Sequence, residues 1–481
     1  MLTFPGWLIL SAVVALWLGL GCVAAGHAVM YKRDPRAATI WVFTSFTLPA
    51  VGPWLYWTFG INRIERRAVR HLGRRDRPFR APHLEEARAD EAARDEAVGH
   101  LNSLRTVADR VTRLPILTGN RIQPLHNGEQ AYPRMLRAIA GAERSVTLAS
   151  YIFDWDQVGH EFAWALGAAA RRGVRVHVLL DGIGALGSFS RMGRRLIRAG
   201  AEVAAFFPLR FPFGRLRLNL RNHRKILVVD GRTGFTGGMN ISQRYLACGD
   251  GPDRVEDLHF QITGPVVAEM QHAFIEDWTM ATGRALSGEA YLPELSAAGT
   301  ALCRGISSGP DEDFEIIHWM LQAAFASATR SVRIATPYFI PSAPLISAMA
   351  MAALRGVEIR LLLPSLVDRR FMRWAADAYL WQLLERGIRV FRRPPPFVHT
   401  KLLIVDERWI LLGSANLDRR SFRLNFEFNV EAYDARLAGE LSAWLDELTG
   451  RCEEVTLEQM DTRPAWRRLR DGVVKTFSPF L

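Results

Sequence analysis

Two short runs of the chain repeat one set of chemically active residues. Each has a histidine, a lysine two positions later, an aspartate five positions after that, and then a glycine and an asparagine. The positions are His223, Lys225, Asp230, Gly237 and Asn240, and, offset by 176, His399, Lys401, Asp406, Gly413 and Asn416. Histidine can serve as nucleophile or acid–base group, and a neighbouring cation can stabilise developing negative charge. One such run would be weak evidence, but two at a constant offset favour a functional site.

Lysine usage strengthens this interpretation. Among 61 basic residues only four are lysines, and two of the four occupy the same position of the repeat. Lysine offers a compact ammonium where arginine offers a planar fork, so its retention here indicates a specific role. In a strand, residues i and i+2 project from one face, so His and Lys should point into the same space. The apolar stretches that follow, 226–229 and 402–405, predict that each strand is buried in a sheet.

The two runs close two longer repeats that predict an α/β fold. Residues 145–153 resemble 331–339, and both have the pattern of buried strands. The remaining expected elements are helices at 161–171 and 343–354 and strands at 173–180, 200–203, 356–363 and 387–390. Strands alternating with helices indicate an α/β sheet in each half, and internal duplication is the economical interpretation.

The position of the charge indicates the partner. The 481 residues carry 61 Lys and Arg against 49 Asp and Glu, a net charge of +12. Residues 31–36, 61–80 and 461–481 contribute +2, +6 and +3, which leaves +1 for residues 81–460. A nucleic-acid-binding protein more often spreads its excess over a folded face, so we expect no nucleic-acid partner. Four cysteines fit a reducing compartment rather than a disulfide scaffold.

Two runs without charged residues, 2–30 and 37–61, explain the clustered charge. The first is long enough to span a bilayer, and the second is interrupted by Pro49 and Pro53, which favours a kink or partial re-entry. We expect a transmembrane hairpin over residues 1–62. The positive-inside rule then places the eight arginines of 61–80, and with two spans also the N-terminus, in the cytoplasm. A cleaved signal peptide is the alternative for the first run, but a positive n-region is missing.

The same patterns divide the rest of the chain. We expect an Arg-rich juxtamembrane segment and solvated helical linker over 63–115, and α/β domains over 116–300 and 301–460. We expect a basic amphipathic tail over 461–481, suited to anionic headgroups.

With two His-x-Lys-x4-Asp motifs, the sequence resembles the phospholipase D superfamily. More narrowly it resembles the bacterial cardiolipin synthases, through the apolar hairpin and the runs 336–341, 413–422 and 425–427. The resemblance covers nearly the whole chain. It implies two similar α/β domains packed so that both motifs face one central cleft.

The resemblance also implies a mechanism. One histidine attacks phosphorus and forms a phosphohistidine, while the other passes a proton between the leaving and incoming alcohols. It favours His223 as nucleophile and His399 as acid–base group. The implied supporting residues are Lys225 and Lys401 at the phosphoryl oxygens, Asn240 and Asn416 as neutral donors, and Asp257 and Glu427 orienting the rings. Asp230 and Asp406 complete the motifs, but they lie at the far ends of the strands and look structural. No metal or cofactor is implied, because the lysines supply the positive charge.

The implied reaction transfers the phosphatidyl group of one phosphatidylglycerol to another, giving cardiolipin and glycerol. The implied location is the bacterial inner membrane, with the protein multi-pass, its catalytic domains cytoplasmic and anionic lipids as partners. Three alternatives stay open: a phospholipase or transferase that uses water or another alcohol, a nuclease of the same superfamily, and a non-enzymatic lipid-binding scaffold. A scaffold would not require two intact motifs.

Overall fold

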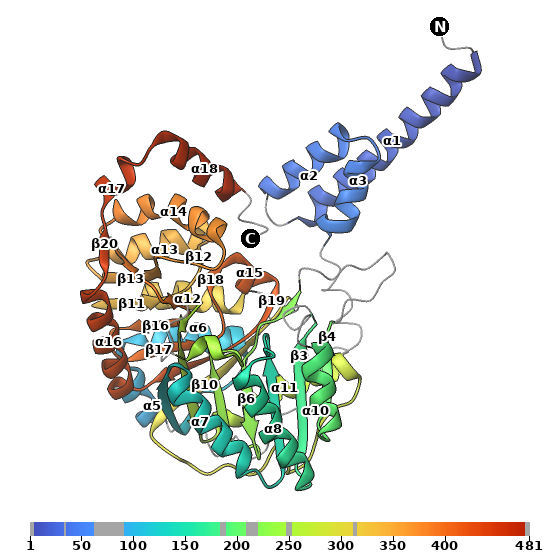
Figure 1. Cartoon of the computed structure of the whole chain (residues 1–481). Helices are drawn as coiled ribbons and strands as arrows, with labels where there is room; N and C mark the ends of the chain where they lie inside the picture. The colour runs from blue at the N-terminus through green and yellow to red at the C-terminus, as the bar shows by residue number, and fades with distance from the viewer. Residues whose placement is uncertain are drawn as a thin grey trace. The chain divides into compact units, whose positions relative to one another are not determined.

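The computed structural model describes residues 4–32, 35–61, 91–182, 189–207, 220–246, 253–310 and 315–476. The chain divides into two compact units, residues 1–76 and 77–481, which we describe one at a time (Figure 1). Residues 63–90 of the segment and linker expected at 63–115, and the last five residues of the expected tail, lie outside the described residues.

The first unit contains α1 (Phe4–Tyr31), α2 (Pro35–Thr47), α3 (Val51–Leu55) and the π-helical turn η1 (Tyr56–Gly60). Among the described residues, α1 is the one helix long and apolar enough to cross a membrane. Its 22-residue apolar stretch begins at Leu10.

The second apolar run does not form the expected second full span. Helix α2 has 13 residues, which is about 20 Å of helix against a hydrocarbon core of about 30 Å. The chain turns at 48–50 and returns as α3. Gly52 permits this close return, because a Cβ there would overlap the carbonyl oxygen of Thr44. His27 Nδ1 and Tyr56 Oη, 2.7 Å apart, connect α1 to η1.

The second unit is built on one mixed sheet of 16 strands whose two halves repeat the same order. From the centre outward, the first half runs β1, β9, β7, β6, β2, β3, β4. The second runs β10, β19, β17, β16, β11, β13, β14, with β20 at the edge. The sixteenth strand, β5, lies off this path and pairs with β19. Strands β1 and β10 pair antiparallel at the centre. The duplication expected from the sequence is present as two half-sheets joined into one sheet.

The first-half strands are β1 (Leu117–His126), β2 (Ser145–Ser150), β3 (Arg175–Asp181), β4 (Glu202–Phe206), β5 (Arg221–Asn222), β6 (Ile226–Val229), β7 (Thr233–Gly237), β8 (Val255–Glu256) and β9 (Leu258–Thr263). The second-half strands are β10 (Ala301–Ser308), β11 (Ser331–Ala335), β12 (Phe339–Ile340), β13 (Glu358–Pro364), β14 (Arg389–Arg393), β15 (Phe397–Val398), β16 (Leu402–Val405), β17 (Trp409–Gly413), β18 (Leu417–Asp418), β19 (Asn425–Tyr433) and β20 (Glu453–Val455).

The main helices of this unit are α5 (Glu91–Val98), α6 (Asn102–Thr112), α7 (Asn127–Ala140), α8 (Gln157–Arg171), α10 (Arg194–Arg198), α11 (Val266–Thr282), α12 (Ile316–Ser327), α13 (Ala343–Leu354), α14 (Arg370–Leu384), α15 (Arg419–Arg423), α16 (Ala435–Gly450), α17 (Leu457–Asp461) and α18 (Ala465–Thr476).

Helices cover both faces of the sheet, which explains why the motif strands are continuously apolar. Alternate residues of β6 and β16 contribute to one apolar cluster that extends through both halves and packs against α11 and α16. The other residues of these strands enter separate clusters, one for each half, on the opposite face. The shared core makes the two halves one body.

The expected solvated linker is instead part of the core. Leu101, Leu104 and Ala108 of the α6 region are fully buried in the second-half cluster, against α12. Asp109 pairs with the buried Arg304 of β10. The expectation was wrong because the charged residues of this segment hide an apolar stripe at helical spacing.

Candidate active site

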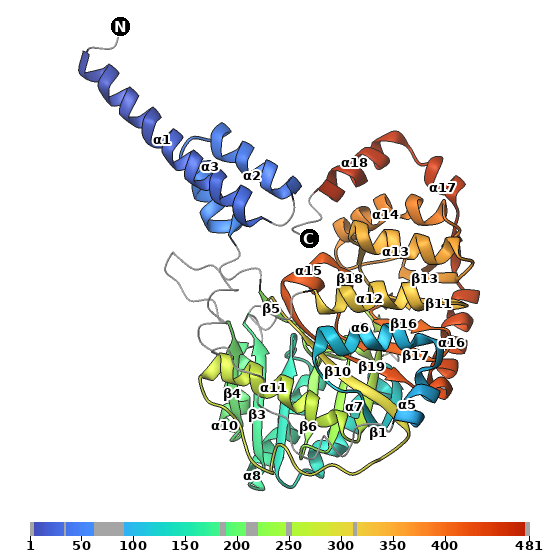
Figure 2. The same cartoon turned by 180° about the vertical axis from the view of Figure 1, so that it is seen from behind.

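Two short pairs of parallel strands join the halves and position the histidines. Strand β5 pairs with β19, with Asn222 opposite Phe426. Strand β15 pairs with β8, with Val398 opposite Glu256. The candidate site residues come one position after these pairs, so His223 comes opposite Glu427 and His399 opposite Asp257. Figure 2 shows β5 reaching from the first half to β19 of the second.

Each histidine is held by the acid of the other half. His223 Nδ1 lies 2.9 Å from Glu427 Oε2, and His399 Nδ1 lies 2.8 Å from Asp257 Oδ2. The two carboxylates are fully buried. The sequence predicted these four residues as a set, and the structure brings all four together in crossed pairs.

Burial sets the protonation states of the pairs. It lowers the pKa of His223 and lowers that of His399 to about 4. Burial alone would raise the pKa of Asp257 and Glu427, but the contacts with the histidines and lysines lower it. A neutral ring beside a carboxylate donates through Nδ1, which leaves Nε2 as the nitrogen for chemistry.

Both lysines are buried beside the histidines. Lys225 Nζ donates to the His223 carbonyl at 2.7 Å, and Lys401 Nζ donates to the His399 carbonyl at 2.6 Å. Burial lowers their pKa to about 7 and about 8. An ammonium has three N–H groups, so each lysine keeps donors for an anion, and a bound anion would favour the charged form.

The two asparagines differ in their contacts. Asn240 Nδ2 donates to Tyr245 Oη at 2.9 Å, and its Oδ1 accepts from the Ile152 amide at 3.2 Å. Both ends of that amide therefore have protein partners. Asn416 is also buried, but its Oδ1 has no hydrogen-bond partner among the described residues. The expected phosphate contact needs an N–H donor, and a side-chain amide nitrogen carries two N–H groups, so both asparagines can still supply one.

The motif aspartates, which complete the motifs but were expected to be structural, bind backbone amides. Asp230 accepts hydrogen bonds from the backbone amides of residues 143–145, where β2 begins. Asp406 does the same for residues 329–331 before β11, and it also accepts from His100 Nε2 at 2.6 Å. Burial opposes ionisation of Asp406, but these hydrogen bonds lower its pKa to about 2.

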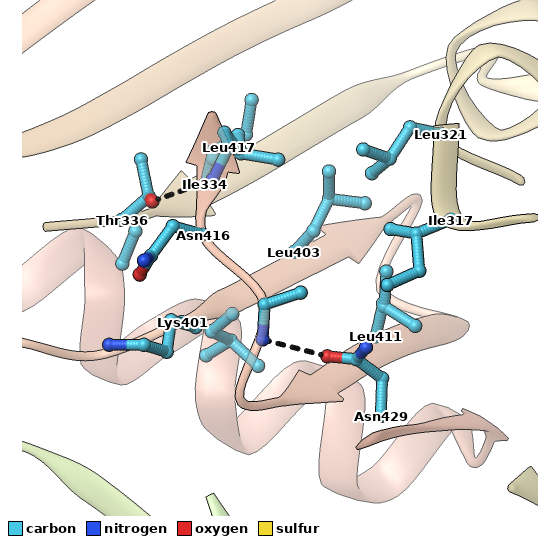
Figure 3. Close-up of a pocket in the computed structure, with 13 residues that line it drawn as sticks. Ile317, Leu321, Ile334, Thr336, Lys401, Leu403, Leu411, Asn416, Leu417 and Asn429 are labelled. Carbon is cyan, nitrogen blue, oxygen red and sulfur yellow. Dashed lines mark hydrogen bonds between the residues drawn. The ribbon is translucent and has the colours of Figure 1, made fainter. Parts of the chain in front are cut away.

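A small cavity lies behind Lys401 in the second half (Figure 3). Its volume is about 20 Å³, enough for about one water molecule. Apolar side chains such as Leu321 and Leu403 line most of it, and Thr336 and Asn416 add polar groups. It is too small for a lipid, so it is a packing defect or hydration site beside the lysine.

Three contributors to the site were missed by sequence reasoning. Ser414 Oγ donates to Glu427 Oε2 at 2.5 Å. Arg224 is buried and links Asp277 of α11, at 3.0 Å, to Ser307 of β10, at 2.6 Å. The ring of Tyr151 meets that of His223 edge-on at 5.3 Å. Ser414 carried a signal, because it stands where the first half has Gly238. The contacts of Arg224 and Tyr151 depend on the packing of both halves.

Comparisons with known proteins point to one family. The family model described as "Cardiolipin synthase, PLD-like domain" matches residues 135–278 and 321–449, which include both motifs. The chain is 34% identical over 470 residues to cardiolipin synthase A of Pseudomonas aeruginosa, covering 96% of this chain and 94% of that protein. It is 32% identical over 452 residues to cardiolipin synthase of Geobacillus kaustophilus, covering 94% and 90%.

Among solved structures, phosphatidylserine synthase of Haemophilus influenzae aligns with a TM-score of 0.61 at 16% identity. The alignment covers 79% of this chain and all of that one. At this identity the likeness concerns the fold alone.

Proposed function

Because the chain belongs to the cardiolipin synthase family of the phospholipase D superfamily, we propose that the crossed histidine–acid pairs are its catalytic centre. The protein is a phosphatidyltransferase of a bacterial membrane and acts on phospholipids. The proposal concerns the residues, the order of events and the two lipids.

In the proposed first half-reaction, His223 Nε2 attacks the phosphorus of one phosphatidylglycerol. The N–P bond forms, the bond from phosphorus to the glycerol oxygen breaks, and His399, whose protonated form the bound phosphate anion favours, gives its proton to that oxygen. Glycerol leaves, and the phosphatidyl group stays on His223. The assignment of His223 as nucleophile follows the family resemblance.

In the second half-reaction, the glycerol hydroxyl of another phosphatidylglycerol gives its proton to His399 and attacks phosphorus. The N–P bond breaks, and cardiolipin forms. Lys225 and Lys401 stabilise the negative charge that develops on the phosphoryl oxygens, and Asn240 and Asn416 add neutral donors. Glu427 and Asp257 hold the rings with Nε2 toward phosphorus.

The single observation that carries this proposal is the crossed pairing. Each motif histidine meets a fully buried carboxylate at 2.8–2.9 Å, across the boundary between the halves. A lipid-binding scaffold would gain nothing from two such pairs, because burying charge is costly unless it is paired for a purpose.

The test is conversion of headgroup-labelled phosphatidylglycerol by the full chain in nanodiscs. We expect cardiolipin and free glycerol. Samples denatured in SDS at neutral pH, where the acid-labile N–P bond survives, should show phosphatidylated His223 in His399→Ala and none in His223→Ala. Phosphatidic acid as the main product would instead indicate hydrolysis, and cardiolipin formation by both variants would rule out the two-histidine mechanism.

The proposed topology departs from two full spans. If α1 crosses the bilayer and α2–α3 re-enters from the cytoplasmic side, the charged residues at 31–36 and 61–80 lie on one side, as the positive-inside rule favours. The N-terminus then lies outside and the catalytic body in the cytoplasm. Labelling of a cysteine added at the N-terminus by an impermeant reagent in whole cells should succeed; labelling only after lysis would support two spans.

A further inference from the structure

Helix α18 (Ala465–Thr476) presents its apolar face outward. Trp466, Leu469 and Val473 are 59%, 70% and 49% exposed. They are spaced i, i+3 and i+7, so they form one stripe along the helix. A surface helix of a globular protein normally turns such a stripe toward the core.

The opposite, polar side of α18 attaches it to the body. Asp471 is 1% exposed. It accepts from Arg463 Nη1 at 2.9 Å and from Arg470 Nη2 at 2.7 Å. Lys475 Nζ lies 4.4 Å from the ring centroid of Tyr379 in α14. Figures 1 and 2 both show α18 beside α14. The contacts fix the helix with its apolar stripe away from the protein.

Basic side chains lie on both flanks of the stripe. At 100° per residue, Arg467 and Arg470 fall on one side and Arg468 on the other. The guanidinium groups of Arg467 and Arg470 lie 5.3 and 5.5 Å from the Trp466 ring. With four basic residues and one acidic residue, α18 has a net charge of +3, against +1 for residues 81–460. Apolar side chains flanked by cations fit the boundary between acyl chains and anionic headgroups.

We propose that α18 lies in the surface of an anionic bilayer and holds the catalytic body against it. Trp466, Leu469 and Val473 enter the headgroup boundary, and the exposed Arg467 and Arg468 contact lipid phosphates. This proposal deepens the proposed function by assigning a second membrane contact, apart from the N-terminal unit. It does not depend on which histidine is the nucleophile.

The test uses the full chain with Leu469→Cys, in a background where Cys22, Cys248 and Cys452 are serine and the buried Cys303 is kept. The cysteine carries an environment-sensitive fluorophore, and the protein is placed in nanodiscs of phosphatidylcholine with or without phosphatidylserine. We expect a blue shift and protection from aqueous iodide only with phosphatidylserine, weakened by high salt. The control is Trp164→Cys on α8, 68% exposed in the native chain, which should stay accessible throughout.

Three outcomes would overturn the proposal. The label could respond equally in both discs. It could be shielded in detergent in a way that depends on protein concentration, which would indicate a second copy on the stripe. It could also be shielded in detergent at all concentrations, which would indicate that another part of this chain covers the stripe. The readout is independent of turnover, so a protein that binds but makes no cardiolipin would contradict the proposed function alone.

A second variant connects the contact with turnover. Leu469→Glu should raise the apparent KM for phosphatidylglycerol in mixed discs about tenfold, with kcat little changed. A tenfold change is at the lower end of what it costs to return one buried leucine side chain to water. Trp164→Glu serves as the matched control and should change neither. A loss of kcat without a change in KM would show that α18 acts on the catalytic centre rather than on the membrane.

Discussion

The two halves of the catalytic body carry the same motif at the same offset but support it differently. Glu427 accepts hydrogen bonds from His223, Ser414 and Asn425. Its counterpart Asp257 is shorter and accepts from His399 and from the Leu258 amide. The first half has Gly238 where the second has Ser414, because any Cβ at Gly238 would overlap the Asp257 carboxylate. The longer acid has room for an extra donor, and the shorter acid requires a glycine.

The residue between histidine and lysine differs as well. In the first half it is Arg224, whose guanidinium reaches α11 and β10, and whose Nε donates to the Glu427 carbonyl at 3.2 Å. In the second half it is Thr400, a short buried side chain. Neither half contains a complete histidine–acid pair of its own. The comparison teaches that duplication supplied the parts, whereas the crossing of strands β5 and β8 made the halves interdependent.

The largest expected effect comes from neutralising one acid at a time. Glu427→Gln and Asp257→Asn should each lower turnover by roughly 10²–10⁴-fold, the range for a positioned acid–base group. Loss of the negative neighbour should also lower the pKa of the ring it holds, so Glu427→Gln moves the titration of His223 and Asp257→Asn that of His399. NMR of ring-labelled histidine measures both. A shift of the same-half histidine would break the crossed arrangement.

A smaller effect is expected from the motif aspartates, on stability rather than chemistry. Asp406→Ala should lower the free energy of unfolding by about 2–3 kcal/mol, because the pKa of Asp406 in the fold is about 2 against about 4 unfolded. A carboxylate whose pKa is lower in the folded than in the unfolded protein stabilises the fold at pH values above the unfolded pKa. The difference in unfolding free energy between wild type and Asp406→Ala should therefore be complete above about pH 4 and vanish toward pH 2.

Asp230→Ala should cost less, because Asp230 lacks a counterpart to the His100 contact among the described residues. Denaturant unfolding in detergent across this pH range measures both variants, and Glu407→Gln is an exposed control at the same turn. Equal costs at pH 7 would show that His100 adds nothing.

The smallest effect concerns the turns after the motif strands. Residues 230 and 231 have φ of 52° and 64°, and residues 406 and 407 have φ of 52° and 51°. Glu407→Gly should stabilise the protein by about 0.5–1 kcal/mol, because glycine adopts this conformation at little cost. Gly231→Ala should destabilise it by more, since its Cβ would also overlap the Tyr291 carbonyl. Thermal unfolding of the two variants measures the contrast, and a neutral Gly231→Ala would contradict it.

Much of the fold could be predicted from the sequence, because strands and helices leave a local periodicity of apolar residues. The expected helix 343–354 is α13, and the expected strands at 145–153 and 331–339 contain β2 and β11. The errors lay where local signals mislead. Charged residues hid the buried stripe of α6. The uncharged run 37–61 was expected as a second span with a kink or partial re-entry at its prolines, and α2 ends after 13 residues, before Pro49. Uncharged composition predicts burial in lipid or protein, but not where a helix stops.

The sequence alone singled out the candidate reacting groups, since a constant offset of 176 between His223 and His399 and between Lys225 and Lys401 needs no coordinates. It also supplied both acids. Only the tertiary structure decided which acid serves which histidine, because that depends on the register of β5 on β19 and of β15 on β8. These pairings join residues some 140–200 positions apart, and no local pattern encodes them. The same reason applies to α18, whose sequence shows an apolar stripe but not the direction in which packing turns it.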